Sequence, residues 1–157
     1  MIQYRAPWFN DNVVNPGSID MIFSQAVLEH VDELREAYRA MRKWLATDGF
    51  MSHEIDFKSH GWASEWNGHW SYSDTMWKLI RGLDSWFINR MPASAHLELL
   101  EQEGYRVIRF DRESRPNQFK RPQLSKRFRQ IPDIDLETSE AFLQATKTGV
   151  PPDLRKP

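Results

Sequence analysis

The hydrophobic period changes sharply within one early segment, SIDMIFSQAVLEHVDELREAYRAMRKWLATDGFMSHEIDF, which spans residues 18–57. It opens with a short apolar run at 19–23 that is typical of a strand buried on both faces. From Ala26 to Leu45 the apolar residues recur at three- and four-residue steps, which predicts an amphipathic helix. The turn residues at 47–49 are expected to end this helix, and 50–57 returns to an extended pattern.

A strand, a helix and a second strand in this order form a βαβ unit. The connection is too long for a hairpin, so the two strands are expected to run parallel with a right-handed crossover. The sequence therefore predicts the α/β fold class, in which helices cover a mostly parallel sheet.

The rest of the chain predicts two further helices and two further strands. Ser73 or Asp74 is expected to cap a helix that runs to about Ile88, with Trp77 and Trp86 on its buried stripe. The other expected elements are a helix at 96–103, strands at 105–110 and 140–147, one helical turn around 124–128 in a long loop, and a tail at 148–157.

Composition excludes several classes of protein. The 157 residues, 40% of them hydrophobic, are enough for one globular domain, and a net charge of −1 argues against wholesale binding to nucleic acid or an anionic membrane. No apolar run approaches the roughly 18 residues of a membrane span, and the first residues do not resemble a secretory signal. The absence of cysteine excludes disulfides and thiolate metal sites. We therefore expect a soluble, cytoplasmic protein.

Polar residues follow the first predicted strand at the position where parallel α/β sheets bind ligands. Ser24 and Gln25 end that strand, and Glu29 and His30 are expected in the first turns of the following helix, where the helix dipole favours a carboxylate. In the alternative interpretation, Glu29 only caps the helix and His30 is an ordinary surface residue.

The same segment resembles the region from the fourth to the fifth strand of class I S-adenosylmethionine-dependent methyltransferases. Members of that family show a Leu-Glu-His signature at the start of the helix and a Leu-x-x-x-Gly turn into the next strand, and 28–30 and 45–49 match both. Later blocks, HEIDFKSH, INRMPASAHLELLEQEGYRVI and FLQATK, resemble later parts of the family. The resemblance implies a Rossmann-like sheet whose strands are mostly parallel and whose last strand is antiparallel.

The family's Gly-rich cofactor loop and the acidic residue after its second strand have no counterpart here. Ile2 to Trp8 looks like the family's third strand, so 1–147 resembles an incomplete domain whose sheet has an exposed edge. Three explanations stay open: a fragment of a longer methyltransferase, a half-domain completed by a partner chain or by a second copy in a homodimer, and a remnant kept for binding.

The resemblance also implies functional residues for methyl transfer from S-adenosylmethionine to a small-molecule acceptor. Cofactor contacts are expected from Ala6, Pro7, Trp8, Ser24, Gln25 and Glu29. A base is expected among His30, His53 and His60, with Asp56 as an orienting partner. The loop residues Trp62, Trp66, Trp70 and Tyr72 are expected to line the substrate pocket, although aromatic clusters of this kind often fill a core.

Two other interpretations come from the residues alone. A carboxylate and three imidazoles, Asp56, His53, His60 and His69, can bind zinc or iron, but their spacing matches no short motif and we predict no metal. The segment 106–129 is rich in Arg and Lys with interleaved Phe, as a groove for single-stranded RNA would be, although such runs are more often solvated loops.

Overall fold

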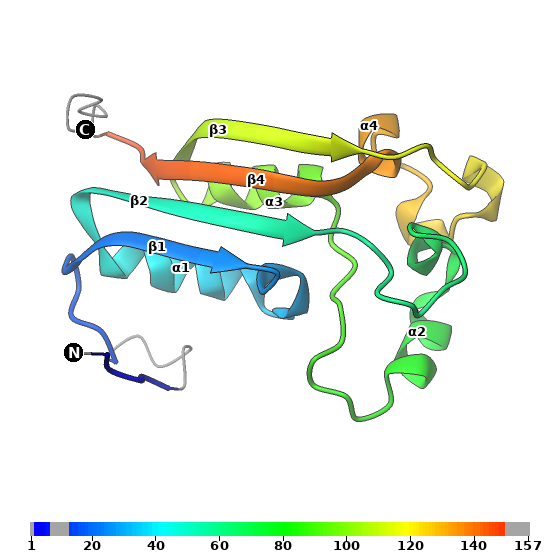
Figure 1. Cartoon of the computed structure of the whole chain (residues 1–157), viewed down its shortest axis with the longest axis horizontal. Helices are drawn as coiled ribbons and strands as arrows, with labels where there is room; N and C mark the ends of the chain where they lie inside the picture. Colours follow the sequence, from blue (N-terminus) through cyan, green and yellow to red (C-terminus); the bar gives the residue numbers. More distant parts are fainter. Residues whose placement is uncertain (1, 7–12, 150–157) are drawn as a thin grey trace.

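A computed structural model describes residues 2–6 and 13–149. Its four-stranded sheet has the order β1-β2-β4-β3 (Figure 1). The strands are β1 (Ile19–Gln25), β2 (Leu45–Asp56), β3 (Tyr105–Ser114) and β4 (Thr138–Lys147). β1 pairs with β2 in parallel, whereas β4 is antiparallel to both β2 and β3. Three strands thus share one direction and the last strand opposes them, which confirms the predicted α/β class.

The helical elements are short. They comprise α1 (Leu34–Trp44), α2 (Asp74–Arg81), α3 (Ala93–Gln102) and α4 (Asp133–Leu136), with 3-10 turns η1 (Leu28–His30), η2 (Gly68–Ser71), η3 (Arg121–Gln123) and η4 (Lys126–Phe128). The helical turn expected around 124–128 corresponds to η4. Within the described residues, no helix has the length and apolar character needed to cross a membrane.

The long helix predicted from Ala26 is wrong at its beginning. Ala26 has a φ of 50°, and the chain then forms η1 and an extended residue at Val31 before α1 begins. The Asn89 side chain donates hydrogen bonds of 2.8 Å to the carbonyls of Leu28 and Val31 and so holds this irregular connection. The 3.6-residue pattern of the sequence cannot reveal such a distant contact.

The end of α1 also differs from the prediction, because β2 begins at once at Leu45 and includes the expected turn residues 47–49. At Gly49 a Cβ atom would lie 2.8 Å from the carbonyl oxygen of Ile19 and 3.0 Å from that of Asp20. Glycine is therefore needed here for the close approach of β2 to β1, where the strand pairing is irregular.

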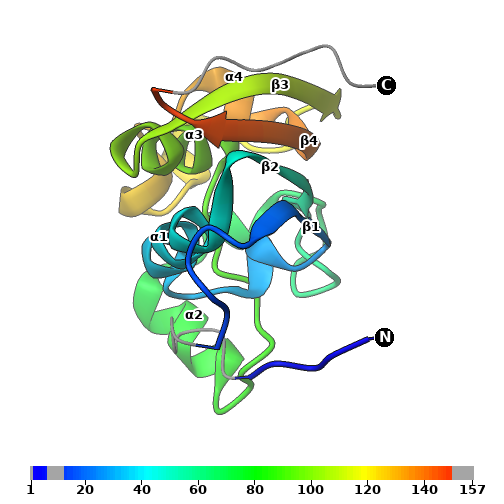
Figure 2. The same cartoon turned by 90° about the vertical axis from the view of Figure 1, so that its left-hand side faces the viewer.

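The main core lies between the sheet and two helices, α1 and α3, which cover the same face (Figure 2). Inward residues of the central strands are almost fully buried, among them Met51, Ile55 and Leu143. On the other face of β1, Met21 and Phe23 are 47% and 71% exposed. The described residues therefore cover one face of the sheet far better than the other.

Two smaller aromatic clusters are separate from the main core. One contains Trp70 and Phe128, and the other contains Trp77 and Phe87. The core position predicted for Trp86 is wrong, since its side chain is 79% exposed whereas that of Trp77 is 6% exposed. The physical reason is that α2 ends at Gly82, with a φ of 56°, so the helical spacing does not extend to Trp86.

The strand expected at 2–8 is wrong for its described part. Residues 2–6 form no strand, and Ile2 and Tyr4 are 100% and 91% exposed, while residues 7 and 8 lie outside the described residues. Among residues 2–6 and 13–149, β1 pairs only with β2, so its outer backbone groups have no strand partner. That a second copy or a partner chain covers this edge stays a prediction.

Candidate functional site

The carboxyl ends of β1 and β2 lie at the same edge of the sheet, because the two strands are parallel. Ser24 pairs in register with His53, and its hydroxyl forms a 2.8 Å hydrogen bond with Nδ1 of that imidazole. His53 is 1% exposed, and burial lowers its pKa to about 4. It is therefore a neutral, interior partner of Ser24 and not an open acid or base.

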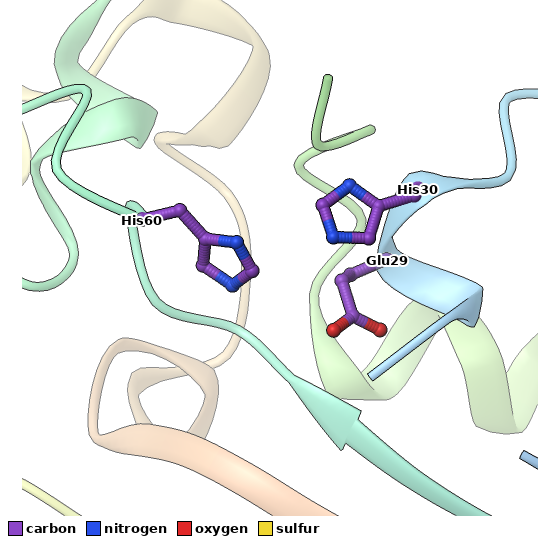
Figure 3. Close-up of side chains that lie close together, drawn as sticks. All are labelled: Glu29, His30 and His60. Carbon is purple, nitrogen blue, oxygen red and sulfur yellow. The ribbon is translucent and has the colours of Figure 1, made fainter. Parts of the chain in front are cut away.

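Three side chains converge beyond this strand end: Glu29 and His30 from η1, and His60 from the loop after β2 (Figure 3). Each offers one nitrogen or oxygen atom, and these atoms all lie within 4.8 Å of one another. The rings of His30 and His60 meet edge to face with their centroids 5.2 Å apart. We refer to these residues as the Glu29–His30–His60 cluster.

Glu29 is the most unusual member of the cluster. It is 3% exposed, and neither carboxylate oxygen has a hydrogen-bond partner among the described residues. Burial, together with the negative charge of Asp56, raises the pKa of Glu29 to about 7, while nearby backbone N–H groups and Lys58 oppose the shift. The expected stabilisation by a helix N-terminus is wrong, since Glu29 lies in a three-residue turn and not in α1.

His60 connects the cluster to solvent. Its side chain is 26% exposed, and its Nε2 lies 3.4 Å from Oδ2 of Asp56, which also pairs with Lys58 at 3.1 Å. Lys58 in turn contacts Glu140 on β4. An open groove of about 540 Å³ runs past His60 and is lined by Asp56, Lys58, Ser59, Gly61, Ala63, Ser64, Glu65 and Trp66. Of the three histidines expected as candidates for the base, His60 is thus the one that Asp56 contacts.

Of the four residues that the sequence suggested as metal-capable, only Asp56 and His60 lie in contact. His69 is 1% exposed, with its ring 4.7 Å from that of Trp70, and His53 is bound to Ser24. Neither belongs to the cluster, which unites His60 with Glu29 and His30 instead. Sequence reasoning missed this combination because the irregular turn at η1, which directs Glu29 and His30 towards the loop after β2, has no local sequence signal.

The remaining cofactor residues expected from the sequence are not brought together in the described structure. Gln25 lies exposed at the end of β1, and Ala6 is exposed in the N-terminal segment. Pro7 and Trp8 lie outside the described residues.

The four aromatic residues proposed for the substrate pocket have different environments. Trp66 lines the groove beside His60 and donates a 3.0 Å hydrogen bond to the carbonyl of Pro116. Trp62 is 43% exposed and packs on Phe87 at 4.5 Å. Trp70 is 1% exposed within a core cluster, and Tyr72 stacks on the Trp77 ring. Trp62 is thus exposed, Trp66 and Tyr72 are half-buried, and Trp70 belongs to the interior.

A second cavity, of about 370 Å³, was not foreseen from the sequence. It is lined by Asp32, Asp74, Trp77, Lys78, Arg81, Ile88, Asn89, Arg90, Met91 and Arg127. Arg90 is 4% exposed, lies over the rings of Trp77 and Phe128, and pairs with Asp74 at 2.5 Å. The positive charges that line this cavity are therefore largely neutralised by ion pairs with Asp32 and Asp74.

Several side chains of the basic segment 106–129 pack or pair within the chain. Phe128 is 1% exposed in a core cluster, and Phe110 packs against the main core. Arg109 pairs with Asp111 at 2.6 Å, and Arg129 donates to the carbonyl of Leu124 at 3.1 Å. Phe128 is therefore not free to stack on a base, while binding of RNA by the segment stays an alternative from the sequence.

A family model described as a methyltransferase domain matches residues 8–52, which include β1, η1, α1 and the first part of β2. The overall structure is similar to that of solved methyltransferases. The chain has the class I methyltransferase fold. No curated protein matches it in sequence.

Three solved structures illustrate this methyltransferase-fold likeness. An S-adenosylmethionine-dependent methyltransferase from Mesorhizobium loti has a TM-score of 0.52 at 14% identity, over 84% of this chain and 63% of that protein. The trans-methyltransferase CalH, solved with SAH, has a TM-score of 0.53 at 14% identity, over 91% and 35%. The cyclase SpnF has a TM-score of 0.50 at 16% identity, over 84% and 50%. The chain therefore spans less than two thirds of each of these proteins.

Proposed function

We propose that this chain takes part in methyl transfer from S-adenosylmethionine to a small-molecule acceptor. The observation that carries the proposal is the polar site at the carboxyl ends of β1 and β2, in a fold similar to that of solved methyltransferases. The family match over 8–52 supports it, because that segment contains the strand end and the following turn. The cyclase with the same fold is a reason to test the chemistry directly.

The residues present suit one end of such a cofactor. Ser24 and Gln25 stand at the strand end, where the hydroxyl of Ser24 is held by His53, and we assign them to the methionine end of the cofactor. His53 acts through Ser24 and is therefore a positioning residue. The bound cofactor supplies a methyl group already activated as a sulfonium, so the protein chiefly has to align the acceptor with it.

The groove beside His60 is the proposed place of the acceptor. It lies next to the strand end, and its lining combines Trp66 with charged groups from Asp56 and Lys58. An aromatic wall with a few polar groups is the usual composition of a small-molecule site. Trp62, on the same loop, is exposed enough to contribute to the wall.

Calorimetric titration of the chain with S-adenosylhomocysteine tests this function. We expect one saturable site, weakened about 5- to 30-fold by Ser24→Ala, because one hydrogen bond to a bound ligand contributes about 1–2 kcal/mol. Ser85→Ala, an exposed serine after α2, is the matched control and should leave affinity unchanged. A wild-type chain that binds no S-adenosylhomocysteine, or binding that Ser24→Ala does not alter, would contradict the proposal.

A further inference from the structure

The Glu29–His30–His60 cluster combines features that the proposed methyl-transfer site does not require. Its members come from two segments about thirty residues apart, and the fold directs their polar atoms towards one another (Figure 3). Glu29 is almost fully buried with both oxygens unpaired, and Nδ1 of His30 is also buried without a hydrogen-bond partner among the described residues. Buried polar groups without partners are costly and call for an explanation.

We propose that the Glu29–His30–His60 cluster binds one divalent transition-metal ion, with Zn²⁺ as the best match to its ligands. Two imidazoles and one carboxylate are a common zinc ligand set that leaves a position for water or substrate. A cation there would offset the cost of the buried, unpaired carboxylate. The proposal is independent of the proposed function, and it assigns Glu29 to the metal and not to the cofactor.

The geometry needs only small adjustments to accept an ion. Ligand atoms about 2.0–2.2 Å from zinc lie roughly 3–3.5 Å from one another in a tetrahedral site, and here they already lie within 4.8 Å. His60 has the freedom to close the remaining distance, since it lies in a loop with a partly exposed side chain. The groove of about 540 Å³ beside His60 gives an ion a path from solvent.

Asp56 supplies a second feature of protein metal sites. Metal-binding histidines usually donate their other ring N–H to a carboxylate, which fixes the ring and increases the basicity of the ligand nitrogen. Nε2 of His60 lies 3.4 Å from Oδ2 of Asp56, which leaves the other ring nitrogen for the ion. Asp56 is thus a positioning residue for His60.

The test is a calorimetric titration of the tag-free full chain with Zn²⁺ in a non-chelating buffer. We expect one ion per chain and a raised melting temperature, because an ion that binds only the folded state stabilises it. His60→Asn and Glu29→Gln should each weaken affinity by more than about 100-fold, and Asp56→Asn by about tenfold. Asn is the suitable replacement for His60, whose φ of 51° it tolerates well.

Glu101→Gln is the matched control, since it removes an exposed carboxylate on α3 that belongs neither to the cluster nor to the groove beside His60. It should bind zinc like the wild type. Circular dichroism without metal shows whether each variant is folded, and if Glu29→Gln is not, His60→Asn decides the question. A stoichiometry other than one, or equal affinity of wild type and His60→Asn, would overturn the proposal. The titration with S-adenosylhomocysteine is separate, so either proposal can fail alone.

Discussion

The five histidines of this chain form two populations with different environments. His53, His69 and His96 are each 1% exposed, and burial lowers their pKa values to about 4, 3 and 3. His30 and His60 instead face each other at the strand end, beside the open groove. The comparison shows that burial, and not residue type, separates histidines that belong to the packing from those available for chemistry.

The interior population is held by packing and single hydrogen bonds. Nδ1 of His96 forms a 2.8 Å hydrogen bond with the hydroxyl of Tyr38, and the rings of His69 and Trp77 lie 6.3 Å apart. His30 and His60, the two histidines at the strand end, are held by fewer packing contacts and hydrogen bonds. Substitutions in the interior should therefore change stability, whereas substitutions at the edge should change binding.

The largest expected effect is at Trp77, which lies in the core cluster with Phe87 and next to the ring of His69. Trp77→Ala should lower the free energy of unfolding by about 3–5 kcal/mol, because it removes a large buried ring that contacts Phe87 and Arg90. Trp86→Ala, only nine residues along the chain but exposed, should change it by less than about 0.5 kcal/mol. Urea denaturation of both variants checks the pair, and equal losses would contradict the assigned environments.

The second prediction concerns the pH dependence of His96. Its pKa is lowered to about 3 in the folded chain from an ordinary value of 6.5, so below pH 6.5 the unfolded chain binds the proton more readily. The free energy of unfolding should therefore decrease as the pH decreases. One such group contributes a loss of about 2 kcal/mol between pH 6.5 and 4.5. His96→Gln should be less stable at pH 7 but less sensitive to acid over that window. Urea denaturation at several pH values checks this prediction. If the free energy of unfolding of wild type and His96→Gln changed equally with pH, the lowered pKa of His96 would be refuted.

A smaller effect is expected where the interior meets the strand end. Ser24→Ala removes the hydrogen-bond partner of the buried Nδ1 of His53 and should lower the free energy of unfolding by about 1–2 kcal/mol. Thermal denaturation against the Ser85→Ala control measures the difference. No loss of stability would mean that His53 does not depend on Ser24.

The smallest effect on folding is expected at the edge itself. His60→Asn should change the free energy of unfolding by less than about 0.5 kcal/mol in the absence of metal, because the side chain is partly exposed and its backbone conformation suits Asn. Urea denaturation in the presence of a chelator provides the measurement. A loss comparable to that of Trp77→Ala would place His60 in the interior population.

Local patterns predicted much of the fold but failed where distant residues intervene. The strand at 19–23 and the helix near 96–103 correspond to β1 and α3, because each has its period and end signals within its own sequence. Trp86 continued a helical spacing that Gly82 interrupts, and the turn at η1 depends on Asn89, some sixty residues away. The second cavity, around Arg90, brings together segments that no local window contains.

The sequence by itself determined the parallel strand pair, the α/β class and the position of polar residues after β1, because hydrophobic periodicity and chain direction are local properties. Only the tertiary structure decided which histidines are buried and which face the groove, and it alone joined His60 to Glu29 and His30. The physical reason is that burial, which sets the cost of a charge and the reach of a side chain, depends on contacts between residues far apart in the chain.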